Sequence, residues 1–275
     1  MYILNYNSFT LENDTYHTID QLDGIARVDV RRSEDFLTGA DGGNIWSRKF
    51  GMRILSIGGA IFAPDYSTYY SQRALLQTAF NITNTNNLLT ITKSDGTQKT
   101  IQAKVVDVPD FKETAGEAIS AYYQITMKCE NPFFTGTSLV TGTTGPTSGG
   151  GTPVPMPVPT PVGNLPSYAS VTNSGDMSVY PTITLLGPVS YPVIVNQTTG
   201  KTFTLGVDVL AGETITMYYD QTGFYVLNGS TNYYQYFTGD FPAVIVGGNL
   251  FTLGGTGTNA NTLLTISFYE AYLSI

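Results

Sequence analysis

The chain has 275 residues, a formal net charge of −8 at pH 7 and a sequence pI near 4.5. Its single cysteine and single histidine exclude a disulfide framework, a multi-thiolate metal site and a paired-histidine metal site. The acidic balance argues against a surface for duplex nucleic acid, because phosphate binding needs a stripe of basic residues. Charged residues make up only 12% of the chain, so its surface must consist largely of amides, hydroxyls and some of its 19 tyrosines.

Two features bear on location. The longest apolar run, residues 54–64, is interrupted by Ser56, Gly58 and Gly59 and is too short to cross a bilayer. Residues 1–10 lack the basic and apolar regions of a signal peptide. We therefore expect that the chain does not insert into a membrane. We expect it to fold in a reducing cytoplasm.

Composition changes once along the chain, and this change predicts two domains. Residues 141–166 are rich in Gly, Ser and Thr and then in Pro-X-Pro, which favours a flexible segment followed by polyproline II. We predict an N-terminal domain at 1–136, a linker at 137–166 and a C-terminal domain at 167–275. The alternative is a single domain with one long surface loop, although structureless loops beyond ~15 residues are uncommon in compact domains.

The N-terminal part reads mostly as strands. Val28 and Val30 alternate with charged residues, which is typical of a half-buried strand. One helix is expected at residues 68–80, capped by Asp65 or Ser67. Its apolar face would hold three residues at helical spacing, Tyr69, Leu76 and Phe80.

Two further strand signals follow the helix. Residues 88–93 and 97–108 flank Asp95-Gly96, a strong signal for a β-hairpin. Residues 119–130 then alternate strictly and stop at Asn131-Pro132. Their apolar face is predicted to hold Ile119, Ala121, Tyr123, Ile125, Met127 and Cys129.

The C-terminal part alternates with fewer charges. Phe203, Leu205, Val207 and Val209 share one strand face, and residues 264–268 form another alternating run. Turn signals recur every ~8–12 residues, which is the pattern of a β-sandwich. The predicted fold class is therefore all-β with one short α-helix.

Few residues are candidates for catalysis or metal binding. We expect His17 to be a surface residue of an early strand and Cys129 to be a small core side chain rather than a nucleophile. Glu34, Asp35 and Asp41 form an acidic loop, but their spacing is not that of a calcium loop. No pair of carboxylates can be chosen for glycosidase chemistry, and the Gly-rich residues 254–257 lack the lysine and helix of a phosphate-binding loop. We predict no enzyme activity, no cofactor and no metal.

Aromatic residues between 218 and 237 form the most distinctive candidate surface. Adjacent tyrosines point to opposite faces of a strand, so one of each pair would remain at the surface. Such residues can pack internally, bind a protein partner or stack on a sugar, and all three alternatives stay open. The candidate aromatics are Tyr218, Tyr225, Tyr233 and Tyr236.

The order of several segments resembles the distal tail protein (Dit) family of long-tailed phages. In the N-terminal domain these segments are Arg31–Glu34, Asp41–Asn44, Phe50–Gly59 and Lys128–Phe134. In the C-terminal domain they are Asn173–Asp176, Pro181–Ile183, Gly212-Glu213, Leu227–Gly229 and Gly247–Asn249. The Pro-rich linker is the main departure from the family pattern.

This resemblance implies a structural virion protein at the tail tip, synthesised in the host cytoplasm. The N-terminal domain would be a β-sandwich or barrel-like domain that forms a homohexameric ring, and the C-terminal domain would be a galectin-like β-sandwich. The ring would join the tail tube protein to the baseplate hub or tail-associated lysin, and DNA would pass through its lumen without sequence-specific recognition. A receptor-binding protein or a host glycan is a further expected partner. The alternative function is a carbohydrate-binding module that uses the aromatic C-terminal domain for host adhesion.

Overall fold

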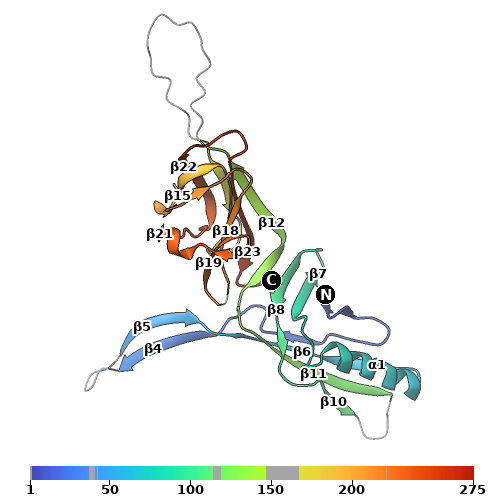
Figure 1. The fold of residues 1–275 in the computed structure, drawn as a ribbon. Helices are drawn as coiled ribbons and strands as arrows, with labels where there is room; N and C mark the ends of the chain where they lie inside the picture. Colours follow the sequence, from blue (N-terminus) through green and yellow to red (C-terminus); the bar gives the residue numbers. More distant parts are fainter. Residues whose placement is uncertain (1, 37–40, 42, 114–118, 147–166, 221) are drawn as a thin grey trace, which may run out of the picture. The chain divides into compact units, whose positions relative to one another are not determined.

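A computed structural model describes residues 2–36, 41, 43–113, 119–146, 167–220 and 222–275 (Figure 1). Regular structure in these residues is almost entirely β-strand, with one α-helix and one short 3-10 helix. The predicted class, all-β with one short helix, is confirmed. The chain forms two compact units: unit 1 comprises Met1–Thr137 and Tyr272–Ile275, and unit 2 comprises Ser138–Ala271.

The first sheet of unit 1 contains the predicted hairpin. It runs in the order β2, β1, β7, β8, followed by the start of β12, and all neighbours are antiparallel. The hairpin β7–β8 turns at Gly96, whose φ of +83° is the left-handed conformation that glycine adopts without strain. The strand bounds are β1 Tyr2–Tyr6, β2 Phe9–Leu11, β7 Leu88–Lys93, β8 Gln98–Gln102 and β12 Phe134–Thr144.

The second sheet of unit 1 has the order β10, β11, β6, β3, with the short strand β9 also paired to β11. The strict alternation predicted for residues 119–130 is confirmed in β11, whose odd-numbered residues from Ala121 to Cys129 are buried. Ile119 was placed on the same buried face and this part is wrong, because it precedes the strand and is exposed. Both sheets of unit 1 are open among the described strands, so they do not form the barrel-like closure considered above. The bounds are β3 Gln21–Asp23, β6 Arg53–Phe62, β9 Lys104–Val105, β10 Asp110–Glu113 and β11 Ser120–Cys129.

Helix α1, Tyr66–Ala79, has well-defined ends. Asp65 is the N-cap, because its carboxylate accepts the Thr68 backbone N–H at 2.8 Å. At the other end the Ala79 carbonyl accepts amide hydrogens from Asn7 and Asn84, at 2.9 and 2.8 Å. The predicted apolar face is confirmed: Tyr69, Leu76 and Phe80 are fully buried in the core of unit 1.

A buried arginine ties several segments of unit 1 together. The Arg53 Nε donates to the Pro132 carbonyl and its Nη2 donates to the Leu273 carbonyl, both at 2.6 Å. Its Nη1 donates to the Gly24 carbonyl, and the guanidinium lies 4.5 Å from the centre of the Phe134 ring. The C-terminal segment 272–275 therefore belongs to unit 1, whereas the sequence predicted that it would lie in the C-terminal domain.

Unit 2 consists of two antiparallel sheets around one apolar core. One sheet contains the end of β12 and then β23, β14, β18, β19 and β20. The other has the order β13, β22, β15, β16, β21, with β17 paired to β15, and both sheets contribute to the core. The bounds are β13 Ala169–Asn173, β14 Thr182–Leu186, β15 Val189–Asn196, β16 Lys201–Leu205, β17 Asp208–Val209, β18 Thr214–Tyr219, β19 Phe224–Asn228, β20 Thr231–Asn232, η1 Tyr234–Tyr236, β21 Phe237–Gly239, β22 Gly247–Thr256 and β23 Leu263–Tyr272.

The expected linker begins differently in the structure. Residues 137–144 are part of strand β12, not an unpaired spacer. Thr, Leu and Val favour strands here, and Gly142 lies so close to Val171 of β13 that a side chain at position 142 would clash with it. The Pro-rich remainder, residues 147–166, lies outside the described residues.

Candidate functional site

The first candidate surface is a two-stranded hairpin of unit 1, the arm, formed by β4 (Val30–Phe36) and β5 (Gly43–Phe50). Its strands pair only with each other among the described strands, and Figure 1 shows the arm projecting from the β3–β6–β11–β10 sheet. Ile45 and Trp46 are 57% and 67% exposed. A hairpin without a core of its own is marginally stable in water, so the arm offers a surface for a partner.

The arm also holds the acidic residues considered as metal ligands. The Asp35 carboxylate accepts the indole N–H of Trp46 at 2.9 Å, and Glu34 lies 3.5 Å from the guanidinium of Arg32. Asp41 is exposed, and most of the loop from 37 to 42 lies outside the described residues. The described residues contain no group of three or more His, Cys, Asp or Glu side chains placed to hold a metal ion.

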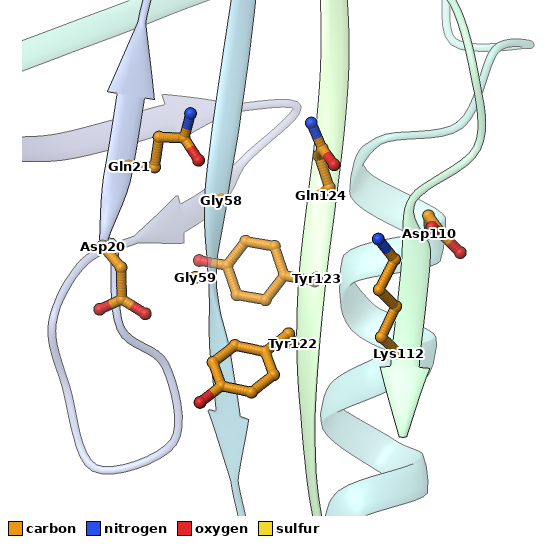
Figure 2. Close-up of a pocket in the computed structure, with 9 residues that line it drawn as sticks. All are labelled: Asp20, Gln21, Gly58, Gly59, Asp110, Lys112, Tyr122, Tyr123 and Gln124. Atoms are coloured by element: carbon orange, nitrogen blue, oxygen red, sulfur yellow. The ribbon is translucent and has the colours of Figure 1, made fainter. Parts of the chain in front are cut away.

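The second candidate is a hollow of about 240 Å³ on the sheet β3–β6–β11–β10 (Figure 2). Two adjacent glycines of β6 form its floor, and Asp20, Tyr122 and Lys112 lie around it. The Tyr123 hydroxyl donates to the Thr18 carbonyl at 2.6 Å. Burial, and to a smaller extent the nearby carboxylates of Asp20 and Asp14, raise the pKa of Tyr123, so this phenol stays protonated. The lining residues are Asp20, Gln21, Gly58, Gly59, Asp110, Lys112, Tyr122, Tyr123 and Gln124.

The third candidate is an aromatic cluster in unit 2. Phe224 lies at its centre, with ring centres of Phe237 and Phe241 both at 4.8 Å. The exposed rings at its edge are Tyr180 and Tyr219, whose centres are 4.5 Å apart, and Tyr234. Partial burial, and then the nearness of Tyr180 and Tyr234, raise the pKa of Tyr219. The cluster comprises Tyr180, Phe203, Tyr219, Phe224, Tyr234, Phe237 and Phe241.

The four tyrosines singled out from the sequence lie beside this cluster as two separate pairs. Tyr218 and Tyr225 face each other across β18 and β19 and stack at 5.3 Å. Tyr233 and Tyr236 meet edge to face at 5.3 Å. All four are half-buried. The sequence missed Tyr180, which precedes β14, because no local pattern links it to residues forty positions later.

The single histidine and cysteine are both buried. His17 was expected at the surface, and this prediction is wrong: the ring is 3% exposed and packs edge to face on Phe9. A backbone β-bridge between His17 and Ile61 holds this segment against the core. The Nδ1 atom of His17 lies 3.3 Å from the Asp14 carboxylate. The expectation for Cys129 is confirmed, because it lies in the core of unit 1 and burial raises the pKa of its thiol to about 12.

No helix among the described residues is both long and apolar enough to span a membrane. No protein-family model matches the chain, and no curated protein matches it. Likeness to known proteins is therefore found at the level of the fold.

The fold of the chain, with its two β-rich units, is similar to that of a solved phage protein. The solved structure that carries this statement is the Dit protein of phage SPP1, described as a paradigm of the hub adsorption apparatus in phages that infect Gram-positive bacteria. The two chains are 15% identical and align with a TM-score of 0.69 over 99% of this chain and 100% of that one.

Two chains from the activated baseplate of phage P2 are also similar. The chain from the structure with Ca is 9% identical, with a TM-score of 0.49 and coverage of 100% of this chain and 99% of that one. The chain from the structure with Sr is 10% identical, with a TM-score of 0.48 and coverage of 97% of both chains.

Proposed function

We propose that this chain is a structural virion protein, the distal tail adaptor of a long-tailed phage or prophage tail. The observation that carries the proposal is the likeness to the SPP1 Dit protein, which spans both units and nearly every residue of the two chains. Its role is assembly rather than a reaction, and its location is the tail tip of the virion.

In this proposal unit 1 forms a homohexameric ring. The ring joins the tail tube protein on one side to the baseplate hub or tail-associated lysin on the other, and a receptor-binding protein is a further partner. Support comes from the open sheets of unit 1, whose edge strands such as β10 and β3 leave backbone groups for pairing with a neighbour. DNA would pass through the lumen, and an acidic chain suits this passage because it does not trap phosphates.

Negative-stain electron microscopy of the purified full-length chain tests the proposal. Closed single rings with sixfold symmetry are the expected particles. Long stacked tubes would instead indicate a tail-tube protein, and isolated monomers over a wide concentration range would contradict the proposal.

A second candidate function is binding of a host glycan by the aromatic cluster of unit 2. The observation in its favour is the exposure of three tyrosines, Tyr180, Tyr219 and Tyr234, on a layer of phenylalanines, because exposed aromatic faces suit stacking on sugar rings.

A glycan array probed with the full-length chain tests this second function. Binding should be lost in Tyr219→Ala and kept in Tyr269→Ala, a matched exposed tyrosine of β23 outside the cluster. Absence of binding to any glycan, or binding that survives Tyr219→Ala, contradicts this use of the cluster.

A further inference from the structure

The arm carries an unusual arrangement of cations near the sheet from which it projects. Arg31 lies directly opposite Lys49, and Arg32 lies directly opposite Arg48. Like charges in directly opposed positions destabilise a strand pair. Two consecutive cation pairs therefore leave this part of the arm with a net positive charge, which the ion pair between Arg32 and Glu34 offsets only in part.

A hollow next to these pairs adds to the positive charge. It has a volume of about 530 Å³ and is lined by Arg27, Arg32 and Arg48, with Asp29 as the one carboxylate among its lining residues. Arg32 has a single ion pair, at 3.5 Å and exposed to solvent, with Glu34. Four cations of the arm, together with Arg27 just before β4, form what we call the basic base: Arg27, Arg31, Arg32, Arg48 and Lys49.

The other end of the arm has the opposite charge. Glu34 and Asp35 follow in β4, opposite Ile45 and Asn44, which carry no charge. Asp41 lies in the connection between the two strands and adds a third carboxylate to this end. We call Glu34, Asp35 and Asp41 the acidic end. The arm is thus polarised, with its cations close to the body of unit 1 and its carboxylates away from it.

We propose that the acidic end of one copy's arm binds the basic base of the arm of the next copy. This inference rests on the proposed ring. A surface that carries complementary charges at its two ends is suited to a head-to-tail contact, and head-to-tail contacts close into rings when the rotation between copies permits. The same contact covers exposed apolar side chains of the arm such as Ile45 and Trp46, which find no core within their own hairpin.

Two variants with opposite charge changes test the contact. Arg31→Glu with Lys49→Glu makes both ends of the arm acidic, and Glu34→Lys with Asp35→Lys makes both ends basic. Each variant alone should need a protein concentration about tenfold or more above that of wild type for assembly, because attraction at every contact is replaced by repulsion. A 1:1 mixture restores attraction at every contact, and its rings should contain the two variants in equal numbers.

Native mass spectrometry of the full-length proteins reads out this experiment, because the variants differ in mass. The control is Lys128→Glu with Lys201→Glu, which makes the same change in net charge at exposed positions of β11 and β16, two strands that are not sheet edges, and it should assemble like wild type. Circular dichroism should show that every variant keeps its fold, since the arm lies outside the core.

The outcomes separate the inference from the function on which it rests. Wild-type rings together with variants that also form rings would overturn the inference and leave the proposed function standing. Failure of the mixture to assemble, or equal disruption by the control, would also overturn the inference. Monomeric wild type would overturn the proposed function and the inference with it. Retention of wild type on DNA that is lost in Arg31→Glu with Lys49→Glu, while this variant still forms rings, would assign the base to phosphate instead.

Discussion

Replacing Arg53 by methionine should weaken unit 1 more than any exposed substitution. Methionine has a similar length and no donor, so it keeps the packing but removes the hydrogen bonds that Arg53 donates to the carbonyls of Gly24, Pro132 and Leu273. The guanidinium is 1% exposed, and burial lowers its pKa from the ordinary value for arginine. Within the described part of the chain its hydrogen bonds go to backbone carbonyls, and these hold the cation.

The magnitude follows from these contacts. A hydrogen bond to a charged group contributes about 1.5–3 kcal/mol, and a buried acceptor left without a partner costs about 1–3 kcal/mol. Three acceptors are affected, and relaxation or water entry recovers part of the loss. We therefore expect a destabilisation of about 3–5 kcal/mol, in the range measured when one partner of a buried charged pair is removed.

Native-state hydrogen exchange is the appropriate assay, because a chain of two units need not unfold in one step. The amides of β6 and β11 should exchange with a free energy lower by that amount in Arg53→Met, while those of β14 and β18 in unit 2 should not change. Arg53→Lys keeps the charge without the fork of donors and should lie between wild type and Arg53→Met. A loss below about 1 kcal/mol in Arg53→Met would refute the reasoning.

Three further predictions follow. Iodoacetamide should modify Cys129 at pH 8 only when the protein unfolds, and rapid labelling of the folded protein would contradict the burial of this residue. The pKa of the Cys129 thiol is about 12 in the folded protein and 9.0 in the unfolded chain, so the stability that the thiol contributes should fall as pH rises between these values. Gly59→Ala should strongly lower the melting temperature of unit 1, because the added Cβ would clash with the Thr18 carbonyl. Gly58→Ala, where the Cβ has room, should leave the melting temperature nearly unchanged. Asp65→Ala should reduce amide protection in α1 above pH 4 and less below it, because the Thr68 N–H lowers the pKa of Asp65.

The sequence predicted those elements whose signal is local. Alternation identifies β11 because each buried residue from Ala121 to Cys129 is two positions from the next. The helix was predicted at residues 68–80 with Asp65 or Ser67 as its cap, and the structure has Tyr66–Ala79 with Asp65. The Asp95-Gly96 turn predicted the β7–β8 hairpin, although β8 ends at Gln102 and not at residue 108. In each case neighbouring residues contain the whole physical reason for the element.

Features that depend on distant contacts were missed. Burial of His17 results from its bridge to Ile61, and the aromatic cluster needs Tyr180 to lie against Tyr219, about forty residues away. Residues 272–275 return to unit 1 through contacts with Arg53 and Lys99, which lie far away in the sequence. Strand β12 extends into the expected linker because its residues find partners that composition alone does not indicate. The charge polarity of the arm could not be predicted, because it is visible only once the pairing of β4 with β5 shows which residues lie opposite each other.

The mass of the full-length chain in native mass spectrometry tests the central claim most directly. A chain of 29.7 kDa that acts as the proposed distal tail adaptor should appear as a closed hexamer at physiological salt, with no larger multiples that grow with concentration. A chain that remains monomeric over a wide range of concentrations, or one that forms open-ended polymers, would contradict the account.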